Sequence, residues 1–161
     1  MQPMDAPTIR LVAADHPCLD DATQCFAEEL RAERRYFGVG ARDVSKPFPS
    51  VIADVTRRDG LRMALVEDHR VVALARIDDR ATVMMAVVAD RRRSGLGTRL
   101  MRALVERAHR SGFDRIVMPA SFRSASLVEL GETLGASVVD LGRGRIDLIF
   151  EAHAARAPAS A

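Results

Sequence analysis

The chain has 161 residues, which suits one domain with a hydrophobic core of its own. Hydrophobic residues make up 48% and charged residues 29%, an ordinary balance for a soluble globular protein, and the net charge of +2 is too small to indicate a nucleic-acid partner. No apolar run approaches the roughly 20 residues that span a bilayer, and the first ten residues lack the pattern of a secretory signal. We therefore expect a cytoplasmic protein with no membrane partner.

The two cysteines, Cys18 and Cys25, lie seven residues apart in a segment that predicts a helix. We expect buried, inert thiols two turns apart, because a reducing compartment disfavours a disulfide. Two cysteines without a histidine at ligand spacing do not form a metal site. The sequence therefore predicts no metal.

The first third of the chain predicts a strand followed by two helices. Asp15 is a suitable N-cap and Pro17 a suitable first-turn residue for the first helix, in which hydrophobic residues recur at helical spacing. The expected elements are a strand at Thr8–Val12, a helix to about Tyr36, an exposed loop at Gly38–Pro49, and a helix at Val51–Arg58 capped by Ser50 and stopped at Gly60.

The middle of the chain predicts an antiparallel meander. Alternation of Leu61, Met63 and Leu65 indicates its first strand, and a turn at Glu67–Arg70 follows. The other two expected strands are Val71–Ile77 and the almost wholly apolar run Ala81–Ala89, joined by a turn at Asp78–Arg80. Such an apolar run is typical of a central strand covered on both faces.

The last third predicts an amphipathic helix, a strand, a helix and a hairpin. Apolar residues repeat every four positions in the first helix, and Gly112 ends it. The expected elements are a helix along Leu96, Leu100, Leu104 and Ala108, a strand at Ile116–Met118, a helix at Ser124–Leu134, and strands at Ser137–Leu141 and Ile146–Glu151. We predict one α/β (α+β) domain over residues 1–151, with a mixed, mostly antiparallel sheet of about seven strands and helices on both faces, and a disordered tail at 152–161.

The most informative segment runs from Val87 to Thr98, where an apolar strand leads through a basic, glycine-containing loop into a helix. The first turn of a helix presents amide groups without intrahelical partners at the positive end of its dipole. Gly95 and Gly97 allow close approach to the main chain, and the arginines Arg91–Arg93 add positive charge. This arrangement favours binding of a diphosphate. The alternative is an ordinary strand-to-helix turn with solvated arginines.

Two common phosphate motifs do not fit, since a Walker loop needs a lysine and a dinucleotide loop needs a third glycine where Leu100 stands. The pattern Arg92-x-x-Gly95-x-Gly97 instead resembles the coenzyme A loop of the GNAT N-acetyltransferase superfamily, Q/R-x-x-G-x-G/A. The resemblance covers about Thr8 to Glu151 and implies a GNAT-like fold with acetyl-CoA as cosubstrate. The residues that it implies for cofactor binding are Val87, Val88 and Ala89 beside the pantetheine arm, Arg92, Arg93, Ser94, Gly95, Leu96, Gly97 and Thr98 around the diphosphate, and Ser124.

Within the superfamily, three segments look most like the acetyltransferase domain of bacterial protein-lysine acetyltransferases. They are Glu33–Phe37, Arg70–Arg76 and Val87–Leu100. The resemblance leaves the acceptor open among a protein lysine, a protein N-terminus and a small amine.

The sequence departs from the family pattern at both proton-transfer positions. Val83 stands where those lysine acetyltransferases carry a glutamate base, and Gly131 stands near the position of a common tyrosine acid. Ser124 occupies a position where asparagine is common, and the sole tyrosine, Tyr36, belongs to the first helix. No catalytic residue is therefore nominated.

Other ionisable side chains are expected to be solvated rather than catalytic. This expectation covers the glutamates of the first helix and two histidines, namely Glu28, Glu29, Glu33, His69 and His109.

We therefore expect an acetyl-CoA-dependent N-acetyltransferase, and a homodimer stays open. The main alternative is a non-catalytic acyl-CoA-binding sensor, favoured by Val83 and Gly131; a nucleic-acid-binding domain using Arg91–Arg93 is a third reading, with aromatic residues at only 4%. A bulky side chain at Gly97 is expected to occupy the anion's place and abolish acetyl-CoA binding while the fold persists.

Overall fold

The computed structural model describes residues 8–14, 17–33, 48–121 and 124–152. Its elements, in chain order, are β1 (Ile9–Ala13), a 3-10 helix (Pro17–Leu19), α1 (Asp20–Ala32), α2 (Phe48–Thr56), β2 (Leu61–Glu67), β3 (Arg70–Ile77), β4 (Val83–Val87), a second 3-10 helix (Ala89–Arg91), α3 (Leu96–Arg110), β5 (Arg115–Ser121), α4 (Ala125–Thr133), β6 (Ser137–Gly142) and β7 (Arg145–Glu151). No helix among these is long and apolar enough to cross a membrane.

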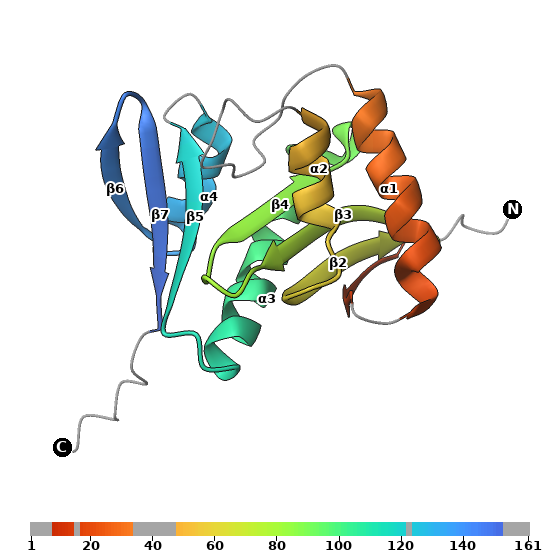
Figure 1. Cartoon of the computed structure of the whole chain (residues 1–161), viewed down its shortest axis with the longest axis horizontal. Coiled ribbons are helices and arrows are strands. Elements are labelled where there is room, and N and C mark those ends of the chain that lie inside the picture. Colours follow the sequence, from red (N-terminus) through yellow and green to blue (C-terminus); the bar gives the residue numbers. More distant parts are fainter. Residues whose placement is uncertain (1–7, 15–16, 34–47, 122–123, 153–161) are drawn as a thin grey trace, which may run out of the picture.

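The seven strands form two antiparallel sheets, one with the order β1-β2-β3-β4 and one with the order β5-β7-β6. Helices α1 and α2 pack on one face of the first sheet and α3 on the other, while α4 packs on the second sheet (Figure 1). The predicted fold class, a mixed and mostly antiparallel arrangement of seven strands with helices on both faces, is confirmed.

Strands β4 and β5 meet at one end only. A single parallel bridge joins Thr82 to Val117, where the Val117 amide donates to the Ala81 carbonyl at 2.9 Å. Main-chain groups alternate in direction along a strand, so residue 119 also turns its backbone nitrogen toward β4. Residue 119 is Pro119, which has no N–H to donate. The pairing therefore cannot continue at Pro119, and the two strands diverge beyond it (Figure 1).

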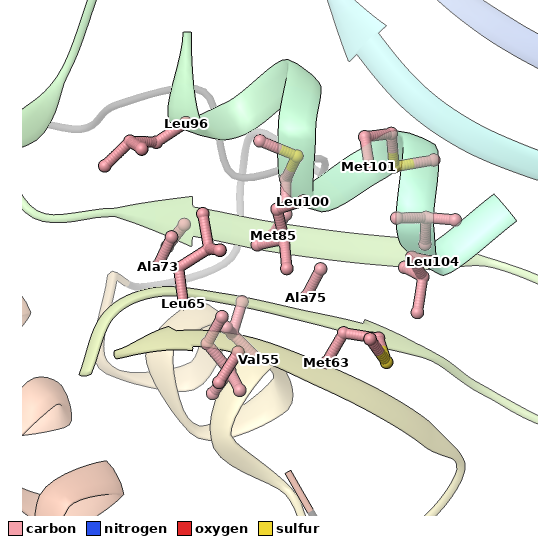
Figure 2. Packing of buried hydrophobic residues seen from close by; sticks show 14 of the residues in the cluster. Val55, Met63, Leu65, Ala73, Ala75, Met85, Leu96, Leu100, Met101 and Leu104 are labelled. Atoms are coloured by element: carbon pink, nitrogen blue, oxygen red, sulfur yellow. The ribbon is translucent and has the colours of Figure 1, made fainter. Parts of the chain in front are cut away.

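The core of the first sheet is closed by α3. Its buried residues are Leu96, Leu100, Met101, Leu104 and Ala108, which follow the predicted four-residue repeat with one addition. Figure 2 shows Leu100 and Leu104 of this helix directed toward the sheet, where Leu65, Ala73 and Met85 lie, with Val55 of α2 on the far side of the sheet. Burial of large aliphatic side chains contributes about 1.5–3 kcal/mol each, so this helix fixes the position of the loop that precedes it.

The first helix is shorter than its hydrophobic pattern predicts. It ends at Ala32 because Glu33 is extended, with ψ at 119°, and the Glu33 amide bonds back to the Leu30 carbonyl. The residue at its N-cap position is Leu19, whose side chain makes no capping bond; Asp15 and Tyr36 lie outside the described residues.

Three further expectations are corrected by the structure. Helix α2 begins at Phe48 rather than at Val51. Strand β5 extends past the expected Met118 to Ser121, because Pro119 faces away from its partner β7 and costs that pairing nothing. Cys25 is exposed on α1, so its predicted burial is wrong; the side chain of Cys18 lies outside the described part.

Candidate functional site

The turn from β4 into α3 places several unpaired amides at one point. Gly95 is the N-cap residue of α3, with φ at 81°, and no side chain caps the helix. The first backbone bond is donated by Arg99 to the Gly95 carbonyl, at 3.1 Å. The amides of residues 96–98 therefore lie in the first turn, where a helix offers no intrahelical acceptor. A Cβ added at Gly95 would meet no atom within 4 Å, so this side of the turn is open.

Gly97 has a different surrounding from Gly95. A Cβ at Gly97 would lie 3.0 Å from Met85 Cε, 3.6 Å from Leu130 Cδ1 and 3.9 Å from Val87 Cγ2. The missing side chain thus points at apolar atoms of β4 and α4. The expectation that a side chain at Gly97 would occupy an anion's place is wrong, since it would press on the packing between α3, β4 and α4.

Only one of the three loop arginines has an uncommitted side chain among the described residues. Arg91 donates to Glu67, at 2.6 Å, and to Asp90. Arg92 donates its Nε to the Val87 carbonyl, at 3.0 Å, and its Nη2 to Glu33. Arg93 is exposed with φ at 58° and has no such partner within the described segments. Ion pairs therefore neutralise most of the positive charge predicted for the loop.

The acidic face of α1 binds this loop. Glu33 Oε1 accepts the Ala89 amide at 3.1 Å while its Oε2 accepts Arg92, and the Glu33 side chain is only 17% exposed. Glu29, one turn earlier, pairs with Arg70, which also donates two bonds to Asp90. The expectation of a solvated glutamate face is wrong for Glu33, whereas the Glu29 side chain stays 41% exposed although it is ion-paired. Their spacing of four residues in the sequence was the available signal, but their partners are distant in sequence.

These ion pairs shift the acid–base properties of the loop. The pKa of Asp90 lies below its usual range, chiefly because Arg70 donates hydrogen bonds to its carboxylate. The pKa of Arg70 is raised by its bonds to Asp90 and Glu29, and that of Arg91 is raised by its bond to Glu67. These shifts favour the charged forms of all three side chains, so ion pairs hold the loop in place at neutral pH.

At the carboxyl end of β4, the main-chain N–H and C=O groups of successive residues point alternately toward β3 and away from it. The Val88 amide donates to the Val72 carbonyl of β3 at 3.0 Å and is used by the sheet. By alternation, Val87 and Ala89 turn their polar groups away from β3. The Val87 carbonyl is bound by Arg92 and the Ala89 amide by Glu33. Of Val87, Val88 and Ala89, the three residues expected beside the pantetheine arm, only Val87 and Ala89 present these main-chain groups on the side away from β3.

The other residues expected at the site are less closely connected. Ser94 uses its hydroxyl to bond the Arg91 carbonyl within the loop. Ser124 is half-buried at the N-cap position of α4, where its carbonyl accepts from Leu127 and Val128 and its side chain makes no capping bond. No described contact connects Ser124 with the start of α3.

The two positions for proton transfer remain without suitable groups. Val83 is fully buried. A Cβ at Gly131 would lie 2.9 Å from Leu148 Cδ1, so this position faces the core of the second sheet. His109 is half-buried, with its Nε2 buried and unpartnered among the described residues, which corrects its expected place on the surface. Within the same residues, no three His, Cys, Asp or Glu side chains gather as a metal site.

Comparison with known structures supports the fold. The structure of yncA from Salmonella typhimurium, which holds its cofactor acetyl-CoA, is 20% identical, with 98% of this chain and all of that chain covered and a TM-score of 0.61. The GNAT domain of S. lividans PAT is 16% identical over 89% of each chain, with a TM-score of 0.67. The ribosomal-protein-S18-alanine N-acetyltransferase of Escherichia coli is 16% identical over 88% of this chain and 91% of that chain, with a TM-score of 0.60.

No curated protein sequence matches the chain. A family model described as "Acetyltransferase (GNAT) family" matches residues 22–131, which include most of α1, the β2–β4 meander, the Arg92–Gly97 loop and α3. The chain belongs to the acetyltransferase (GNAT) family.

Proposed function

We propose that the chain is an acetyl-CoA-dependent N-acetyltransferase that transfers the acetyl group from the thioester to a primary amine. The observation that carries the proposal is the open turn at Gly95, where first-turn amides of α3 lie beside the end of β4. Backbone N–H groups at a helix start bind phosphate oxygens well, and the dipole adds to their attraction.

The residues of the turn fit a coenzyme A diphosphate. The amides from Arg93 to Thr98 would bind the phosphate oxygens, and the uncommitted Arg93 would add a charge-assisted bond. The main-chain groups of Val87 and Ala89 would bind the pantetheine arm, because they point away from β3 where β4 and β5 diverge. The proposed domain extends over residues 1–151, with Ser124 kept as a candidate at its edge.

The bound cosubstrate supplies the acetyl thioester, and the protein holds it in place for attack by the amine. A lysine ammonium has a pKa of about 10.4, so the acceptor must lose a proton before it attacks. Strand β4 has no acid to take this proton, and we propose that water takes it. Positioning of the two reactants then provides most of the rate enhancement. The narrower resemblance to protein-lysine acetyltransferases favours a lysine acceptor over an N-terminus or a small amine.

Gly95→Ala tests the placement of the diphosphate. The new methyl group enters the open space at the turn, and the positive φ becomes strained by roughly 1 kcal/mol. We expect acetyl-CoA affinity, measured by calorimetry, to fall at least about tenfold.

Gly112→Ala is the matched control for Gly95→Ala. Gly112 has φ at 94°, lies just past the other end of α3, and likewise has no atom within 4 Å of its Cβ position. Both variants should lose similar stability, while Gly112→Ala keeps its affinity. Equal affinity of the two variants would contradict the placement of the diphosphate at Gly95.

A second candidate function is a non-catalytic acyl-CoA sensor. The buried Val83 and the core-facing Gly131 favour it, because neither side chain can accept or donate a proton. Both candidates bind acetyl-CoA, but only an enzyme releases free thiol faster when amines are added. A panel of a lysine peptide, a free N-terminus and a small diamine, followed with a thiol reagent, separates the two functions.

A further inference from the structure

Two side chains of this protein bind the main-chain groups at the end of β4. The Glu33 carboxylate accepts the Ala89 amide at 3.1 Å, and the Arg92 Nε donates to the Val87 carbonyl at 3.0 Å. The two side chains also bind each other, and they are 17% and 29% exposed. We call this arrangement the Glu33–Arg92 bridge. It satisfies one donor and one acceptor that would otherwise face the space beside β4.

These are the same groups that the proposed function assigns to the pantetheine arm. Pantetheine carries two amides, and each has one N–H that can donate to the protein and one carbonyl that can accept from it. A main-chain N–H already bonded to a carboxylate makes one of the stronger hydrogen bonds in a protein, because one partner is charged. The arm can therefore bind Ala89 only after Glu33 has moved away from it.

We propose that the Glu33–Arg92 bridge competes with acyl-CoA for the end of β4 and opens when the cosubstrate binds. The inference rests on the proposed function and assigns Glu33 as a positioning residue that controls cosubstrate affinity. The bound diphosphate attracts Arg92 away from Glu33, and the negative charge of the ligand repels the Glu33 carboxylate. Both effects favour the open form.

The neighbouring ion pair gives a matched comparison. Glu29 lies in the last turn of α1, four residues before Glu33, and bonds Arg70, but no described bond connects it to Val87 or Ala89. Removing the charge of Glu29 changes the general electrostatics of the helix as removing that of Glu33 does. Only the Glu33 change alters the competition at the strand end.

The test compares acetyl-CoA binding by the wild-type protein, Glu33→Gln and Glu29→Gln, using calorimetry at fixed ionic strength. We expect Glu33→Gln to bind acetyl-CoA about five- to tenfold more tightly, since a neutral amide competes less well and repels no phosphate. Glu29→Gln should change affinity by less than about twofold.

A second readout separates competition from a general structural role. In the free protein, Glu33→Gln loses part of the bridge, and its melting temperature should fall by roughly 2–4 °C. The rise in melting temperature on adding acetyl-CoA should nevertheless be larger than for the wild type. A residue that merely supports the loop would lower both quantities.

The outcomes distinguish this inference from the proposed function. Weaker or unchanged binding by Glu33→Gln, with normal binding by the wild type, overturns the inference and leaves the proposed function standing. Equal tightening by Glu29→Gln also overturns it, because general electrostatics would then explain the effect. Absence of binding in the wild type and in both variants contradicts the proposed function itself.

Discussion

Gly131 of α4 shows how one missing side chain decides where a helix lies. Its Cβ position is 2.9 and 3.0 Å from the two methyl groups of Leu148 on β7. A side chain at this position would therefore require Leu148 to move, and a large one would not fit against the second sheet. This position serves packing, which explains why it does not carry the tyrosine that the family resemblance led us to look for.

We predict that Gly131→Tyr lowers the free energy of unfolding by about 1–3 kcal/mol through overpacking against Leu148. Urea denaturation measures the change, and Gly131→Ala should cost less, because the methyl ends of Leu148 can shift by a few tenths of an ångström. Acetyl transfer should not rise in the tyrosine variant. A stable and more active Gly131→Tyr protein would show that this position faces the site.

Asp90 is the residue whose protonation at low pH should weaken the ion pairs that hold the loop. Its pKa is lowered in the folded protein, chiefly by hydrogen bonds from Arg70. A carboxyl group of this kind stabilises the fold above its unfolded pKa of about 3.9, and that contribution is lost as the pH falls through the lower folded value. Because the side chain is half-exposed, solvent screening keeps the contribution small.

We predict that the stability difference between the wild type and Asp90→Asn is present at pH 7, begins to shrink below about pH 4, and is lost as the pH falls through the lower pKa of the folded protein. Urea denaturation at pH 7, 5 and 3 tests this, with Asp79→Asn in the exposed turn before β4 as the control. A difference that persists unchanged at pH 3 would show that the Asp90 carboxylate is not the cause.

At the scale of elements, hydrophobic periodicity correctly predicted the features that depend on neighbouring residues in the sequence, namely the kind of each element and its buried face. The four-residue repeat of Leu96, Leu100 and Leu104 became the buried face of α3, and the turn residues correctly separated the hairpin strands. Element ends were less accurate, because they depend on contacts that a local pattern does not contain. The end of α1 is an example, since Glu33 turns outward to bond Ala89, far along the chain.

For the candidate site, too, local features were predicted correctly and long-range contacts were not. The glycine spacing correctly indicated a strand-loop-helix turn with an open Gly95. The ion pairs of Arg91 and Arg92 could not be inferred, because their partners lie on β2 and at the end of α1. The direction of Gly97 toward Met85 was equally hidden, since only the packed fold defines it. Long-range pairing, rather than local preference, limited the prediction.

At the scale of the whole molecule, Pro119 contributes to the division into two sheets. It stands at the first position after Val117 where β5 would donate another bond to β4. The absence of its N–H ends the pairing and lets the strands separate beside the α3 turn. One side chain thus shapes the region that the proposed function requires.

We predict that Pro119→Val supplies the missing donor and extends the pairing of β4 with β5 by one bond. The melting temperature should rise by a few degrees, because a further backbone hydrogen bond contributes about 1 kcal/mol. Acetyl-CoA affinity should fall as the strands close. Rapid hydrogen exchange of the new amide at position 119 would show that the extra bond does not form.

The arrangement of the two sheets along the chain has a consequence for folding kinetics. Strands β2, β3 and β4 follow one another as a meander, and β5, α4, β6 and β7 form a second continuous stretch, so most pairings close short loops. Strand β1 is different, because its pairing with β2 encloses both α1 and α2. Among the strand pairings of the described residues, this one has the largest entropy cost of loop closure. We therefore expect β1 to be the last strand to pair during folding and the first to separate during unfolding.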